Sequence, residues 1–86
     1  MMNPMNKEQF FECIGTVNRY SLLDRMKQDC LYYLGNGRRY APHLWGGDPK
    51  AIIRYMKWLW LSFEEGQRPE WLTMQQIDEF DYQMNG

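Results

Sequence analysis

The sequence predicts an all-α fold: a compact four-helix domain with a long ordered loop between its second and third helices. Only seven of the 86 residues are β-branched, whereas Leu, Met and long polar residues that favour helices are abundant. Four segments carry apolar residues at helical spacing, with Gly and Pro between them. Four Trp, six Tyr, four Phe and seven Met supply a dense core, so this small domain needs no metal or disulfide.

The first predicted helix begins after Asn6 and ends between residues 14 and 18. Asn6 and Gln9 have the spacing of a capping box. The apolar face of this helix consists of Phe10, Ile14 and Val17. Gly15 weakens the helix and marks its predicted end, although one kinked helix running on into the second segment fits the pattern too.

The second predicted helix runs from about Ser21 to Leu34. Ser21 and Asp24 resemble a cap pair at its start, and Gly35 is a natural C-terminal stop. Its core stripe consists of Leu22, Met26, Cys30 and Tyr33. The helix therefore has one buried face and one solvated face.

Residues 35–47 form the predicted long loop. Leu44 and Trp45 should hold it against the core, so we expect the loop to be ordered. His43 is expected to anchor it through a hydrogen bond between its ring and the backbone. Trp45 and Trp71 each precede a helix start, and we expect the two rings to pack near each other over the ends of the second and third helices.

The third predicted helix runs from Pro49 to about Glu64 or Glu65, with Asp48 as its N-cap, and should be the central helix. Its core line consists of Ile52, Met56, Leu59 and Phe63. The fourth begins at Thr73, which forms a capping box with Gln76. The buried face of this last helix consists of Met74, Ile77, Phe80 and Met84.

The residues predict no catalytic or metal site, no cofactor and no enzyme activity. His43 is the only histidine, and Cys30 lies on a core stripe, which suits an inert thiol. Cys13 and Cys30 fit no metal-ligand spacing, so we expect two free, buried thiols. The N-terminus lacks a leader pattern and no apolar run approaches about 20 residues. We therefore expect a soluble cytoplasmic protein without a membrane segment.

The charges are unevenly spread along the chain. The net charge is −1, yet residues 19–57 carry eight basic and three acidic residues, while residues 58–86 carry one basic and six acidic residues. Such a separation suggests oriented binding or head-to-tail packing, and a solvated surface without a role is the competing interpretation.

The outer stripe of the third helix is the predicted binding surface. Its members at helical spacing are Lys50, Arg54, Lys57 and Leu61. Trp58 lies beside this stripe, and two loop arginines could extend it. The candidate set therefore consists of Arg38, Arg39, Lys50, Arg54, Lys57 and Trp58.

Three interpretations of this set remain open. Trp and Arg are common anchors of protein interfaces, and a protein partner is favoured over nucleic acid. Cations beside an aromatic ring also suit nucleic acid, although the acidic net charge counts against it. Alternatively, Trp58 is covered by the loop or the first helix and has a structural role. We expect a monomer or a weak homodimer.

Two stretches resemble a known family. They are Tyr32–Gly37 with His43–Trp45, and Arg68–Met74, supported by Leu22-Leu23, Arg25 and Asp29-Cys30. Over roughly residues 20–84 the chain resembles one of the large polyvalent protein-associated domains. Residues 1–19 are predicted to be an N-terminal helix or extension and residues 20–86 the helical module, within one domain overall.

Members of this family are short α-helical or α+β modules. They occur in long multidomain proteins of phages and conjugative elements, and as small stand-alone proteins of gut bacteria. The resemblance implies a bacterial mobile-element setting and a non-enzymatic interaction module. It assigns no catalytic residue to this chain.

Overall fold

The computed structural model describes residues 4–86 of the chain. Four α-helices and two short 3₁₀ helices follow one another in these residues, in the order α1 Lys7–Ile14, α2 Arg19–Leu34, η1 Ala41–His43, α3 Pro49–Ser62, η2 Glu65–Gln67 and α4 Met74–Asn85. No strand occurs between residues 4 and 86, which confirms the predicted all-α class.

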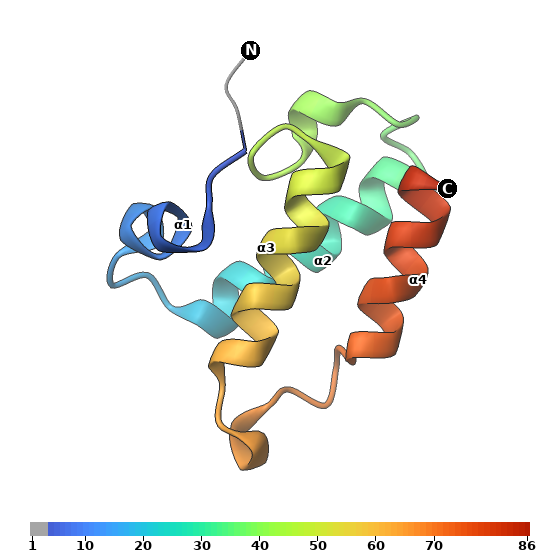
Figure 1. Cartoon of the computed structure of the whole chain (residues 1–86). Helices are drawn as coiled ribbons and strands as arrows, with labels where there is room; N and C mark the ends of the chain where they lie inside the picture. Colours follow the sequence, from blue (N-terminus) through green and yellow to red (C-terminus); the bar gives the residue numbers. More distant parts are fainter. Residues whose placement is uncertain (1–3) are drawn as a thin grey trace.

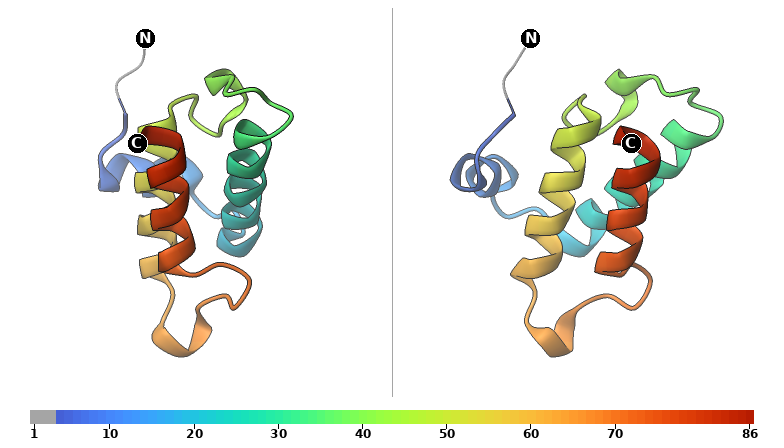
Figure 2. Two further views of the ribbon diagram at one scale, coloured as in Figure 1. Left: turned by 90° about the vertical axis from the view of Figure 1, so that its right-hand side faces the viewer. Right: turned by 45° about the vertical axis from the view of Figure 1, so that its right-hand side comes forward.

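Helix α3 is the centre of the fold, as its apolar spacing predicts. Helices α1 and α4 lie on opposite sides of it, and α2 crosses behind it (Figures 1 and 2). Because three helices surround α3, it buries residues on three sides, namely Ala51, Ile52, Ile53, Tyr55, Met56 and Leu59. No helix among residues 4–86 covers the remaining side of α3, which faces the viewer in Figure 1.

Three helices begin at side-chain caps that the sequence predicts. The Asn6 side chain accepts a hydrogen bond from the Gln9 backbone N–H at 2.8 Å, and the Gln9 side chain accepts one from Asn6 at 3.0 Å. Thr73 and Gln76 form the equivalent capping box at α4. The Asp48 carboxylate accepts from two backbone N–H groups in the first turn of α3. Each cap satisfies N–H groups that would otherwise lack a helical partner.

The junction between α1 and α2 differs from the prediction. Helix α2 begins at Arg19, because Asn18 and not Ser21 is its N-cap; the Asn18 side chain accepts from the Ser21 N–H at 3.0 Å. Gly15, with φ +54°, ends α1, so a single kinked helix is wrong. Val17 follows the helix end and is 45% exposed, so its predicted place on the α1 core face is also wrong.

Helix α3 ends earlier than predicted, at Ser62 rather than at Glu64 or Glu65. The Ser62 hydroxyl donates to the Leu59 carbonyl at 2.6 Å, and Phe63 adopts an extended backbone. This turn places the Phe63 ring 4.3 Å from the Tyr20 ring, centroid to centroid, in a stacked pair. A long-range aromatic contact therefore accompanies this boundary, and local spacing does not contain that contact.

The loop between α2 and α3 is ordered, as predicted. Leu44 is buried in the core. The Trp45 backbone N–H donates to the Asp29 carboxylate at 3.0 Å, and the Arg39 guanidinium donates to the Gln83 carbonyl at 2.9 Å near the end of α4. These contacts attach the loop to three different parts of the fold.

The predicted packing of Trp45 against Trp71 is wrong. Trp45 contacts the rings of Phe10 and Tyr55, with centroids 5.7 Å and 5.6 Å away. Trp71 belongs to the segment at the opposite end of α3 (Figure 1), where the Lys27 ammonium donates to its carbonyl at 2.9 Å. Fourteen helical residues span about 21 Å, so the loops before and after α3 cannot bring their Trp rings together.

Candidate interaction surface

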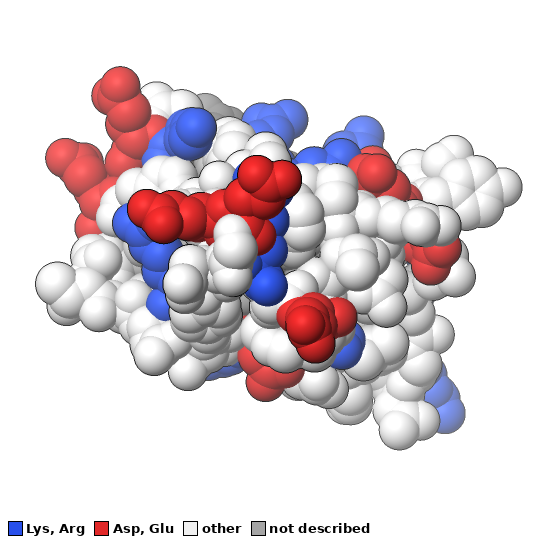
Figure 3. Space-filling view, turned by 90° about the horizontal axis from the view of Figure 1, so that it is seen from below, with Lys and Arg blue, Asp and Glu red and all other residues white. Residues whose placement is uncertain are grey.

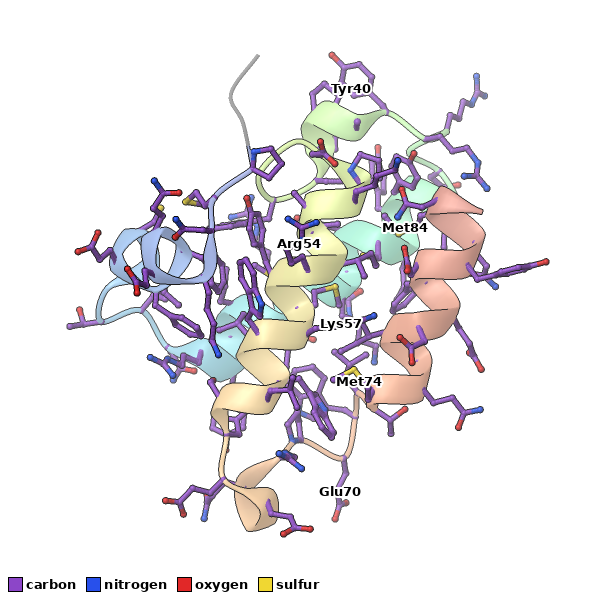
Figure 4. All side chains as sticks on the ribbon, in the orientation of Figure 1. Tyr40, Arg54, Lys57, Glu70, Met74 and Met84 are labelled. Atoms are coloured by element: carbon purple, nitrogen blue, oxygen red, sulfur yellow. The ribbon has the colours of Figure 1, made fainter. Side chains whose placement is uncertain are left out.

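The uncovered side of α3 carries the predicted stripe. We define the α3 outer face as Lys50, Arg54 and Leu61, all of which are exposed opposite buried Ile52. Figure 4 shows Arg54 on the front of α3 and Lys57 between α3 and α4. Leu61 is 56% exposed, which is high for a large aliphatic side chain. The helical spacing thus predicted the direction of this stripe correctly.

A groove follows the α3 outer face on its α4 side. This α3–α4 groove has a volume of about 320 Å³ and is lined by Lys50, Ile53, Arg54, Lys57, Asp81 and Asn85. Three predicted cations therefore meet here, but two acids lie with them. The Lys57 ammonium is 3.0 Å from the Asp78 carboxylate, and Asp81 accepts a hydrogen bond from the Asn85 amide at 3.0 Å.

A second groove follows the same face on its α1 side. This α1–α3 groove has a volume of about 220 Å³ and is lined by Lys7, Phe11, Arg19, Trp58, Leu61 and Ser62. The Arg19 guanidinium lies over the Phe11 ring, 4.8 Å from its centroid. Two ion pairs occur among residues 4–86, and neither includes Lys7 or Arg19. The groove therefore combines an apolar floor with two cations that have no acidic partner.

Trp58 is half-buried, so the first helix covers it only in part. Its ring centroid is 5.8 Å from that of Phe10 and 5.7 Å from that of Tyr55, so one side of the ring packs against α1 and the core. The other side lines the α1–α3 groove. Trp58 consequently lies on the opposite flank of α3 from Lys57.

The two loop arginines do not join this surface. Arg39 donates to the Gln83 carbonyl, and its guanidinium lies 5.8 Å from the centroid of the Tyr33 ring. Arg38 is exposed, and both arginines have left-handed backbone, with φ 49° and 60°. The structure therefore divides the six predicted residues among the α3–α4 groove, the α1–α3 groove and the loop.

Sequence reasoning missed the residues that α1 contributes. Lys7 and Phe11 lie one turn apart on α1, and neither was included in the predicted binding surface. A signal for this contact exists in the third helix, since Ala51, Tyr55 and Trp58 have the spacing i, i+4, i+7 of a second apolar stripe. That stripe marks the side of α3 that α1 covers.

Charged side chains of both signs mix on the molecular surface. Figure 3 views the end of the molecule where α3 finishes and α4 begins, and shows acidic groups with basic ones between them. The exposed acids of this end include Glu64, Glu65 and Glu70. No continuous basic patch is visible on this face.

The two cysteines have different environments. Cys30 is fully buried, and its thiol contacts the Met56 sulfur at 3.7 Å. Burial, with a smaller contribution from the charge of Asp29, raises the pKa of Cys30 to about 12. Such a thiol is a poor nucleophile at neutral pH. Cys13 is exposed, so the expectation that both thiols are buried is wrong for it.

His43 is exposed and lies between two tyrosines. Its ring makes edge contacts with Tyr32 and Tyr40, at centroid distances of 5.4 Å and 5.2 Å. The hydrogen bonds found among residues 4–86 include none from this ring, so the predicted anchoring through a ring hydrogen bond is wrong. Within the same residues no group of three or more His, Cys, Asp or Glu side chains is placed to hold a metal ion.

Comparisons with known proteins place the chain in a family. The family model described as large polyvalent protein-associated domain 11 matches residues 16–84, which is most of the chain and agrees with the resemblance noted in the sequence. Searches of curated proteins and of solved structures found no similar protein. None of the helices in residues 4–86 has the length and apolar character needed to span a bilayer. On the family match, the chain belongs to the large polyvalent protein-associated domain 11 family.

Proposed function

We propose that this chain is a non-enzymatic interaction module of bacterial mobile-element origin that binds a protein partner in the cytoplasm. The docking site is the α3 outer face with its two flanking grooves. The observation that carries the proposal is the exposure of Leu61 beside half-buried Trp58, on a face that no helix of residues 4–86 covers. Aromatic and Arg residues are enriched in protein interfaces, and apolar groups form the centre of such surfaces.

The charges around these apolar groups favour an acidic partner. Five cations line the two grooves, namely Lys7, Arg19, Lys50, Arg54 and Lys57. Among the residues that line these grooves in the described chain, Asp81 is the one acid, and Asp78 pairs with Lys57. Charges at the rim of an interface mainly set the association rate and the choice of partner, whereas buried apolar contacts supply most of the affinity.

Nucleic acid is the less favoured ligand. Asp78 pairs with Lys57, and Asp81 lies in the same groove, so a phosphate placed there would approach two carboxylates. Trp58, the ring available for base stacking, opens into the other groove. The cations of the α3–α4 groove and the Trp58 ring therefore do not form one strip of phosphate and base contacts.

A pull-down from the native host tests the proposal. The tagged chain is compared with Leu61→Glu and Tyr40→Ala, with and without nuclease. Both side chains are exposed, so both variants should fold, which circular dichroism verifies. We expect the wild-type chain to capture a protein whether or not nuclease is added. Leu61→Glu should lose this capture and Tyr40→Ala should retain it. Nuclease-sensitive capture, or capture that Leu61→Glu leaves unchanged, would refute this assignment.

A further inference from the structure

We infer that the α1–α3 groove accepts Tyr82 of a second copy of the chain, so that molecules associate head to tail. This inference rests on the proposed function because it uses part of the same docking site. It identifies one occupant of that site by complementarity of shape and charge. The two surfaces that would meet are both present on every molecule, on α4 and beside α1.

The donor surface is the outer face of α4. Tyr82 is 77% exposed, the highest value among the exposed large hydrophobic residues of the described chain. Asp78 and Glu79 precede it by four and three residues, so they lie one helical turn away on the same side. Asp78 already pairs with Lys57, whereas Glu79 is in neither of the two ion pairs found in residues 4–86. An exposed ring thus lies beside an unpaired acid.

The acceptor surface has the opposite properties. The groove volume is about 220 Å³, and an apolar cavity of about 150 Å³ is known to accommodate a benzene ring. Phe11, Trp58 and Leu61 supply apolar contacts for a phenol ring. Lys7 and Arg19 supply unpaired positive charge next to it. A tyrosine with a neighbouring glutamate supplies both the ring for the apolar contacts and the negative charge for the two cations.

The geometry allows this contact only between molecules. Helices α1 and α4 lie on opposite sides of α3 in both figures, so the groove and Tyr82 of one chain cannot meet (Figures 1 and 2). A contact between two different surfaces is heterologous, and it extends into chains unless a rotation closes a ring. One ring and one ion pair form a small interface, so we expect weak association that grows with protein concentration.

The test is sedimentation velocity of the purified chain in low salt over a concentration series. The wild type should show an average mass that rises with concentration beyond a dimer. Tyr82→Ala and Arg19→Glu should each remain monomeric. Arg19 is the first residue of α2, where an acidic side chain suits the helix dipole, so Arg19→Glu should fold. Tyr40→Ala, which removes an exposed ring elsewhere, should associate like the wild type.

Mixing the two monomeric variants gives the sharpest result. Tyr82→Ala keeps an intact groove and Arg19→Glu keeps an intact Tyr82, so an equimolar mixture should form dimers but nothing larger. The inference fails if the wild type stays monomeric, if Tyr82→Ala associates as the wild type does, or if the mixture stays monomeric. Tyr82→Ala should still capture the host partner in the pull-down. A wild type that stays monomeric but captures a host protein therefore rejects this inference alone. A wild type that self-associates through Tyr82 but captures no host protein rejects the proposed function alone.

Discussion

Replacing Phe10 by alanine should destabilise the whole domain, although Phe10 precedes the family-matched segment. The side chain is fully buried. Its ring stacks on Tyr55 with a centroid distance of 4.8 Å and an interplanar angle of 3°, and it also contacts Trp45 and Trp58. Phe10 therefore joins α1 to the core as one ring packed among three others.

The expected magnitude follows from this packing. Truncating a buried Phe to Ala costs about 3–5 kcal/mol, including the cavity that remains. Lost aromatic pairs put Phe10→Ala towards the upper part of that range. A domain of 86 residues has a total stability of about 4–13 kcal/mol. The melting temperature should fall by at least about 12 °C, since each kcal/mol shifts it by about 4–8 °C at this size.

Urea denaturation followed by circular dichroism measures this effect. Val17→Ala is the matched control, because Val17 is an exposed apolar residue just after the same helix, and it should change stability by less than about 0.5 kcal/mol. If Phe10→Ala stays within about 1 kcal/mol of the wild type, α1 does not contribute to the core as described. Unfolding of α1 alone in Phe10→Ala, with the rest stable, would contradict a single cooperative unit.

Three further changes test other parts of the fold. Gly37→Ala should lower the free energy of unfolding by about 1–3 kcal/mol, because the added Cβ would lie 2.6 Å from the Tyr32 carbonyl oxygen. Thermal melting measures this loss, and an unchanged melting temperature would mean that the loop adapts to the added atom. Asp48→Ala should cost about 1 kcal/mol while Asp48→Asn, which can still cap, should cost little; equal losses would exclude capping as the cause. The wild type should lose part of its stability advantage over Cys30→Ala as the pH rises from 9.0 towards about 12, by up to about 1.4 kcal/mol per pH unit. The reason is that the thiol ionises at lower pH in the unfolded chain than in the folded one. A constant advantage over that range would refute the burial of Cys30 as a neutral group.

Helix starts were predictable where the decisive hydrogen bond is local. Asn6, Asp48 and Thr73 each cap a helix within three residues, so the sequence alone contains the needed partners. The start of α2 was misplaced because Asn18 and Ser21 are both good caps and stand three residues apart. Which of the two residues caps α2 depends on the backbone direction after Gly15, and local helix propensity does not determine that direction.

The candidate site was predictable only in its helical part. The direction of Arg54 and Leu61 follows from the period of α3, and the structure confirms it. The pairing of Lys57 with Asp78 depends on the placement of α4, and the half-covered state of Trp58 depends on α1. Grooves form between elements, so one helix pattern cannot reveal their walls. For the same reason the predicted contact between two Trp rings was wrong.

Photo-crosslinking at the α3 outer face shows whether a protein partner docks there in the cell. A photoreactive amino acid replaces Leu61 in one version of the chain and Tyr40 in another, and both are expressed and irradiated in the native host. Both positions are exposed, and only position 61 belongs to the docking site. We expect a protein adduct at position 61 that resists nuclease and is missing at position 40. Adducts only at position 40, or adducts at position 61 that nuclease removes, would contradict this expectation.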